Sequence, residues 1–181
     1  MMEMFIKGGP LMWPILACSI AALAITIYKS LQYRVILSRM SLIGRLNDFS
    51  APEPLAPLFE AVRAGMDEKG IELVASRQIR GLERGLGSLS LISVISPLLG
   101  LTGTVLGMIQ AFQVIEAHGS RVDPGMLAGG IWQALITTAA GLFVAIPAHV
   151  ALHYLEGRMD TIAWQLKELL ERHLEEKDHG V

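Results

Sequence analysis

The chain has 181 residues, of which 52% are hydrophobic and only 18% are charged. A soluble globular domain is about one quarter charged, so this composition indicates a membrane protein. The net charge of −2, without basic clusters interleaved with aromatic residues, argues against nucleic acid as a partner. The single cysteine, Cys18, excludes an intramolecular disulfide framework.

Three windows of the chain contain no Asp, Glu, Lys or Arg: residues 8–28, 85–115 and 124–155. A membrane-spanning helix needs roughly 20 apolar residues, so each window is long enough. The second and third windows, at about 30 residues, would form helices of roughly 45 Å that project beyond the hydrocarbon core. We therefore predict an all-α integral membrane protein, a single domain over residues 1–181, with transmembrane helices at about 10–28, 88–115 and 126–153.

The first window could also be read as a cleaved signal sequence, because Ile15-Leu16-Ala17-Cys18 resembles a lipoprotein cleavage site. Lys7 is the only basic residue before this window, and Trp13-Pro14 interrupts its apolar run. Both features favour a retained membrane anchor. Cys18 is then expected to be a small packing residue.

The positions of the basic residues predict the orientation. Nine of the fifteen Lys and Arg residues lie in residues 29–84 and four in 158–177, while only Lys7 and Arg121 lie on the other side. The positive-inside rule then predicts an outside N-terminus and a C-terminus in the cytoplasm. The linker 29–87 and the tail 156–181 are expected to be cytoplasmic.

The linker and the tail both have helical character. Three prolines break the linker: Pro52, Pro54 and Pro57. Two helical pieces are expected to flank this turn, and the second is expected to run without interruption into the second span. Apolar residues of the tail recur every three to four positions and predict that the third span continues as an amphipathic helix: Ile162, Leu166, Leu169, Leu170 and Leu174.

Small and hydroxyl residues form one face on each of the second and third spans. On the second span these are Ser93, Pro97, Gly100, Thr104, Gly107 and Ala111. On the third they are Ala134, Thr138, Gly141, Ala145 and Ala148, flanked by Thr137. Small residues at this spacing let helices approach closely in lipid. We therefore assign close packing to Gly100, Gly107, Ala134, Gly141 and Ala145.

The third span also carries an amide, Gln133, one turn from Thr137 and Thr138. A threonine hydroxyl can bond to its own helix, but an unpaired amide in hydrocarbon costs several kcal/mol. Gln133 is therefore expected to face protein or water, in a partly hydrated seam. Pro97 and Pro147 are either tolerated helix prolines or hinges.

Catalytic and metal sites are not expected. The chain has no nucleophile-elbow, zinc-protease or phosphate-loop motif, and Ser93 and Ser96 have no histidine partner on their span. His149 and His153 are one turn apart, but Glu156 is the only candidate for a third ligand, so interfacial histidines are the favoured interpretation. We predict that the protein is not an enzyme.

Two long motifs carry a specific resemblance. Residues 96–108 (SPLLGLTGTVLGM) and 130–148 (GIWQALITTAAGLFVAIPA) resemble the second-span and third-span signatures of the ExbB/TolQ/MotA proton-channel family. Residues 8–14 (GGPLMWP) resemble the first span of ExbB-type members. MotA members have four spans and a larger cytoplasmic domain, so the chain is more similar to ExbB and TolQ.

The resemblance implies an assembly and a function. ExbB and TolQ members form pentamers in the bacterial inner membrane, with periplasmic N-termini, around two single-span helices of an ExbD/TolR-type partner. Proton-motive force drives the complex, and the work passes to a TonB- or TolA-like protein. The expected partners are thus these proteins, further copies of the chain and membrane lipid. Protons are the transported ion, no cofactor is expected, and the energised process is left open.

The resemblance also extends to single residues. Thr104 and Thr138 match the pore-facing threonines of the family, and Pro97 and Pro147 match its two helix prolines. Gln133 stands where ExbB and TolQ commonly have a glutamate, and an amide cannot carry a proton in the same way. The expected carrier is then an aspartate on the partner's helix, solvated by the polar neighbours on this chain. The alternative is a non-conducting membrane scaffold with the same fold.

Overall fold

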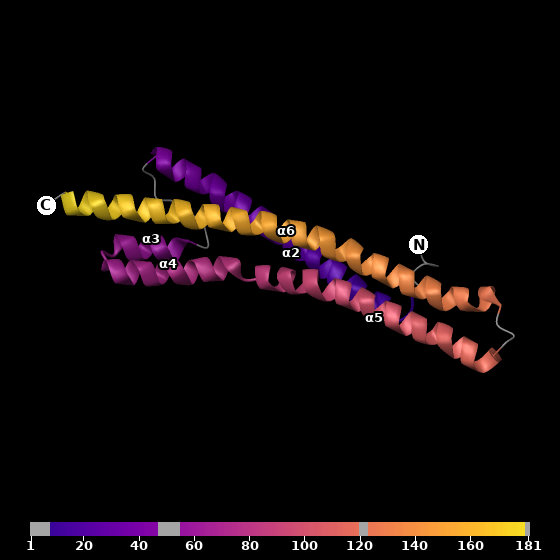
Figure 1. Cartoon of the computed structure of the whole chain (residues 1–181). Helices are drawn as coiled ribbons and strands as arrows, with labels where there is room; N and C mark the ends of the chain where they lie inside the picture. Colours follow the sequence, from indigo (N-terminus) through magenta and orange to yellow (C-terminus); the bar gives the residue numbers. More distant parts are fainter. Residues whose placement is uncertain (1–7, 47–54, 120–122, 180–181) are drawn as a thin grey trace. The chain divides into compact units, whose positions relative to one another are not determined.

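The computed structural model describes residues 8–46, 55–119 and 123–179, and every element in these ranges is helical (Figure 1). The helices are α2 (Met12–Leu46), α3 (Ala56–Arg63), α4 (Glu68–Glu83), α5 (Leu86–His118) and α6 (Pro124–His179). Three stretches of the described chain are long and apolar enough to cross a membrane: Met12–Met40, Glu68–His118 and Pro124–Glu171. The prediction of an all-α chain with three long apolar helices is confirmed.

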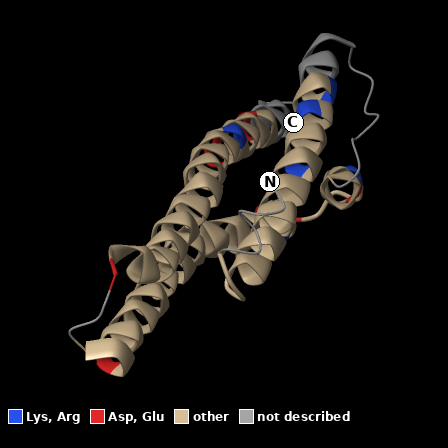
Figure 2. Ribbon diagram, turned by 90° about the vertical axis from the view of Figure 1, so that its right-hand side faces the viewer, with Lys and Arg blue, Asp and Glu red and all other residues tan. Residues whose placement is uncertain are grey.

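The chain divides into two compact units. The first unit comprises Met1–Thr26 and Ser88–Leu152, and the second comprises Ile27–Gly87 and His153–Val181. Among the described residues of the first unit, Glu116 and Asp123 are acidic and none is Lys or Arg. Figure 2 accordingly shows long stretches of helix without coloured charges. The first unit therefore has the composition required of a membrane-embedded bundle.

Most large apolar side chains of the first unit point outward. Phe143 is 82% exposed, and Leu98, Val105, Leu135 and Ile146 are also exposed. The interior of this unit consists largely of small residues, including Ala111, Ala134, Ala145 and Ala148, although Ile15, Leu89 and Leu152 are buried there too. An apolar outer surface around a small-residue interior is typical of helices that pack in lipid.

The second unit has a core of large side chains. Its fully buried residues come from every helix of the unit: Tyr33, Ile36, Leu55, Leu58, Leu82, Leu155, Ile162 and Leu166. Helix α3 begins with a proline in its first turn, where the missing N–H costs nothing, and it packs against α4. This unit has the interior of an ordinary water-soluble helical domain.

The linker differs from its prediction. An uninterrupted helix between the prolines and the second span was expected, and this expectation is wrong, because the chain breaks after α3 and again after α4. After α3, Gly65 N–H donates to the Val62 carbonyl and Met66 N–H to the Ala61 carbonyl. These two bonds form a Schellman motif, which needs a left-handed residue, and Gly65 has φ +68°.

The second break lies between α4 and α5, where Gly85 has φ +100°. The last carbonyls of a helix lack intrahelical partners. Here the Leu82 carbonyl accepts two bonds from α2, one from Lys29 Nζ at 2.8 Å and one from the Tyr33 hydroxyl at 2.8 Å. We call this arrangement of Lys29, Tyr33 and the Leu82 carbonyl the Leu82 clamp. It ties the end of α4 to α2.

The Leu82 clamp buries a cation. Lys29 is 5% exposed and Tyr33 is 1% exposed. Lys29 Nζ also donates to Gln32 Oε1 at 3.1 Å and lies 5.7 Å from the centroid of the Tyr33 ring. A lysine is electrostatically favoured at the negative end of a helix dipole, and a tyrosine ring adds a cation–π contact.

Helix α6 continues from Pro124 to His179, so the apolar third span and the tail form one helix. Ile162 and Leu166 of the tail are buried, and Leu169 and Leu170 are half-buried. The side chain of Leu174 lies outside the described residues. The amphipathic extension expected from the spacing of these residues is present.

Candidate functional site

Helices α5 and α6 cross within the first unit at backbone contact. A Cβ atom added to Gly107 would lie 2.5 Å from the Gly130 carbonyl oxygen, and one added to Gly130 would lie 2.6 Å from the Gly107 carbonyl oxygen. Each glycine thus occupies the space that a side chain on the other would need. Such close approach requires residues without side chains on both helices.

The same close packing continues along the two helices. A Cβ on Gly141 would lie 2.5 Å from the Ser96 carbonyl oxygen, and one on Gly100 would lie 3.0 Å from the Thr137 carbonyl oxygen. A Cβ on Gly103 would collide with the Thr137 side chain. Ala134 and Ala145, which were predicted to serve close packing, are both buried.

Sequence reasoning missed three residues of this crossing: Ser96, Gly103 and Gly130. Ser96 and Gly103 are buried together with Gly100 and Gly107, at alternating steps of four and three residues. The predicted face contained Pro97 and Thr104, which are half-buried at its border. The same four-three spacing starting from Ser96 would have found the face that the structure buries.

The hydroxyl of Thr138 joins the two helices. Its Oγ1 donates to the Gly100 carbonyl at 3.0 Å, across the crossing of α5 and α6. Thr137 is 0% exposed, and its Oγ1 bonds within α6 to the carbonyls of Gln133, at 2.9 Å, and Ala134, at 3.0 Å. The two adjacent threonines therefore differ: the Thr138 hydroxyl bridges two helices, and the Thr137 hydroxyl donates within its own helix.

The remaining candidate residues of the spans have simpler surroundings. Thr104 Oγ1 donates to the Leu101 carbonyl of its own helix at 2.6 Å. Pro97 lies inside α5 and Pro147 inside α6, and both helices continue through them. Pro147 is exposed. The hinge role of the two prolines stays a prediction.

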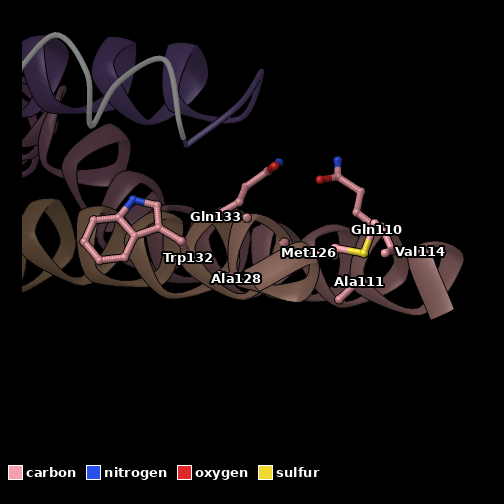
Figure 3. A pocket seen from close by; sticks show the side chains of 9 residues that line it. Gln110, Ala111, Val114, Met126, Ala128, Trp132 and Gln133 are labelled. Carbon is pink, nitrogen blue, oxygen red and sulfur yellow. The ribbon is translucent and has the colours of Figure 1, made fainter. Parts of the chain in front are cut away.

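Gln133 is half-buried and lines a groove of about 630 Å³ between α5 and α6 (Figure 3). A second amide, Gln110 of α5, lines the same groove and was not singled out from the sequence. Figure 3 shows both amide side chains extending to the same side of the two helices. The other lining residues are small or apolar: Ala111, Val114, Met126, Ala128, Gly129, Gly130 and Trp132.

One buried hydroxyl near the crossing is unsatisfied. Ser96 is 0% exposed, and its Oγ makes no hydrogen bond to any described residue. A buried hydroxyl without a partner costs about 1–3 kcal/mol. Ser96 directly precedes Pro97, whose missing N–H also leaves a carbonyl of α5 without its usual donor.

The chemistry of this site follows from its functional groups. Amides and hydroxyls donate and accept hydrogen bonds, but they do not titrate near neutral pH. The arrangement can therefore solvate a polar or charged group without carrying a proton itself. Among the described residues, no group of three or more His, Cys, Asp or Glu could hold a metal ion, and His149 and His153 are exposed.

Residues 55–168 match the MotA/TolQ/ExbB proton channel family. The chain belongs to this family. The match includes the α5–α6 crossing, the Gln133 groove and both motifs that carried the resemblance. The resemblance inferred from the sequence is confirmed.

Named relatives of the family agree with the match. The chain is 49% identical to biopolymer transport protein exbB1 of Vibrio cholerae, over 45% of this chain and 35% of the relative. It is 32% identical to a putative biopolymer transport protein ExbB homolog of Methanothermobacter thermautotrophicus, over 88% of this chain and 64% of the relative. It is 38% identical to the Tol-Pal system protein TolQ of Haemophilus influenzae, over 66% of this chain and 49% of the relative.

These alignments cover between about one third and just under two thirds of each relative's length. Three long apolar helices together with ExbB and TolQ relatives identify this member of the family as a multi-pass membrane protein. Its family is one of proton channels that energise transport, and no enzyme class is associated with it.

Proposed function

We propose that the chain is the ring subunit of an inner-membrane motor driven by the proton-motive force. With an ExbD/TolR-like partner it conducts protons and energises a TonB- or TolA-like protein. The observation that carries the proposal is the polar seam of α6, where Gln133, Thr137 and Thr138 lie together in a predominantly apolar unit. Polar groups inside a membrane bundle mark ion and proton pathways.

The proposal includes an orientation and a ring. The N-terminus is periplasmic and the C-terminus cytoplasmic, which agrees with the basic residues gathered in residues 29–84 and 158–177. Five copies surround the single-span helices of the partner, as the family resemblance implies. The spans are those expected from the sequence, at about 10–28, 88–115 and 126–153, and the linker and tail face the cytoplasm.

In this function the titrating group belongs to the partner. The polar side chains of this chain do not titrate near neutral pH: Thr104, Thr137, Thr138 and Gln133. A carboxyl on the partner's helix therefore picks up and releases the transported protons. These four side chains line its path. A carboxyl that alternates between neutral and charged forms needs polar neighbours while it is charged. Thr138 offers such a neighbour next to the closely packed Gly100.

Co-expression of the chain with an ExbD/TolR-like partner tests the proposal. The purified complex, reconstituted in vesicles with an imposed pH gradient, should conduct protons, and this flux should vanish when the partner's membrane aspartate is changed to asparagine. Thr138→Val should lower the flux while the complex still assembles. Thr138→Ser is the matched control, because it keeps the hydroxyl. Undiminished flux in Thr138→Val would remove this threonine from the path.

A second candidate function is a non-conducting scaffold of the same fold. It is favoured by one observation, the amide at Gln133 where ExbB and TolQ commonly have a glutamate. In the vesicle assay the scaffold predicts no flux in the parent complex and no gain in Gln133→Glu. Flux in the parent complex that depends on the partner's aspartate would exclude it.

A further inference from the structure

The turn before α2 reaches the polar site of the first unit. Gly9 lies in this turn, and a Cβ atom added to it would lie 2.6 Å from Gln133 Nε2 and 3.2 Å from Gln133 Cδ. The Gln133 side chain therefore occupies the space next to Gly9 that any other residue would fill. This contact joins the N-terminal segment to the groove between α5 and α6.

Gly9 is held in place from its own side. The Gly9 carbonyl accepts a bond from Met12 N–H at 3.2 Å, and the Pro10 carbonyl accepts one from Trp13 N–H at 3.3 Å. These bonds fix the turn to the first residues of α2. Gly9 has φ +73°, a conformation that residues with side chains rarely adopt. Gly9 thus presents a fixed backbone surface to the amide of Gln133.

Gln133 is limited on this side by Gly9 and lines the groove together with Gln110. A glutamine side chain on a helix has several rotamers, and the Gly9 backbone excludes those rotamers that would collide with it. We propose that Gly9 is a positioning residue: its missing side chain leaves room for the Gln133 amide, and its backbone orients that amide toward the groove. The functional meaning of this orientation rests on the proposed proton path, but the contact itself does not.

A side chain at Gly9 should therefore displace the Gln133 amide. Gly9→Ala combines two effects, the strain of the left-handed backbone and the collision with Gln133. Gly65→Ala is the matched control, because Gly65 has φ +68° but no atom within 4 Å of an added Cβ. Gly65 thus reports the backbone strain alone.

The first test is a double-mutant cycle on the full chain in detergent, with thermal unfolding as the measurement. Gly9→Ala should lower the melting temperature clearly less in a Gln133→Ala background than in the parent, because the shortened side chain removes the collision. Gly65→Ala should lower it equally in both backgrounds. Equal effects of Gly9→Ala in both backgrounds would overturn the proposal.

The second test observes the amide directly, with NMR of the full chain labelled with ¹⁵N-glutamine. The side-chain resonance of Gln133 is assigned by its loss in Gln133→Ala. It should shift in Gly9→Ala and stay in place in Gly65→Ala. If Gly9→Ala does not fold, Gly9→Asn replaces it, with Gly65→Asn as control, because asparagine tolerates the left-handed backbone better.

An unmoved Gln133 resonance in the folded Gly9 variant would contradict the positioning role. Neither test measures proton flux, so the contact can hold even if the chain proves to be a scaffold. If the chain conducts, Gly9→Ala should also lower flux in the complex with the partner, and Gly65→Ala should not.

Discussion

The two units of this chain pack by opposite means. In the first unit, glycines bring α5 and α6 to backbone contact, and large side chains such as Phe143 point outward. In the second unit, large side chains such as Tyr33 and Ile162 fill the interior. Burial of apolar surface stabilises a protein in water, but in lipid close packing and hydrogen bonds must replace it. The first unit therefore packs as expected in lipid, and the second packs as expected in water.

The two units also differ in the polar groups that link their helices. In the first unit a neutral hydroxyl makes an interhelical bond, from Thr138 to the Gly100 carbonyl. In the second unit a buried ammonium and a phenol share the Leu82 carbonyl. A buried cation is far more costly to remove from water than a hydroxyl, and it is found where partners satisfy it.

The largest expected effect comes from filling the helix crossing. Gly107→Leu should abolish the folded first unit, because an added Cβ already lies 2.5 Å from the Gly130 carbonyl oxygen, which cannot move without its helix. Size-exclusion chromatography of the detergent-solubilised chain should show loss of the monodisperse species. Gly129→Leu is the control, since nothing lies within 4 Å of its added Cβ. A monodisperse Gly107→Leu would mean that the crossing is looser than described.

In the second unit, a cavity should be the most damaging change. Ile162→Ala removes a side chain that is 0% exposed and should lower the free energy of unfolding by about 2–5 kcal/mol. Denaturant unfolding followed by circular dichroism measures this loss. Leu73→Ala, at a position that is 52% exposed, should change stability far less. Similar losses at both positions would contradict a core of large side chains.

The Leu82 clamp should give an intermediate effect that is not additive. Lys29→Met and Tyr33→Phe each leave one donor on the Leu82 carbonyl, and each should cost about 1 kcal/mol. The double variant leaves this carbonyl unsatisfied and should cost more than the sum. A double-mutant cycle of unfolding free energies tests this coupling, with the exposed Tyr28 as control in Tyr28→Phe. Simple additivity would show that the two donors act independently.

The smallest effect should come from the threonines of the first unit. Thr138→Val removes an interhelical bond, and such bonds contribute about 0.6 kcal/mol in membrane proteins. Thr104→Val should change stability less, because its hydroxyl bonds only to its own helix. Thermal unfolding of the purified chain can rank the two. A larger loss in Thr104→Val would reverse the assignment of the bridging hydroxyl.

Charge-free windows were enough to predict three long helices, and the motifs at residues 96–108 and 130–148 carried the resemblance to the family. They could not fix how far each helix turns about its axis, so Ser96, Gly103 and Gly130 were missed at the crossing. Lys29 was counted only among the basic residues of residues 29–84, because nothing in the local sequence indicates that it binds the Leu82 carbonyl, 53 residues away. The break at Gly65 was missed because a glycine within a helical pattern can either continue or end the helix.

The reciprocal contact of Gly107 and Gly130 also restricts how this protein can diverge. Neither residue can become larger unless the other becomes smaller, and glycine cannot become smaller because it has no side chain. No pair of compensating substitutions can therefore replace these two glycines. Substitutions should instead accumulate at the outward-facing residues and in the second unit. The crossing should be the slowest-changing part of the chain whatever process its complex drives.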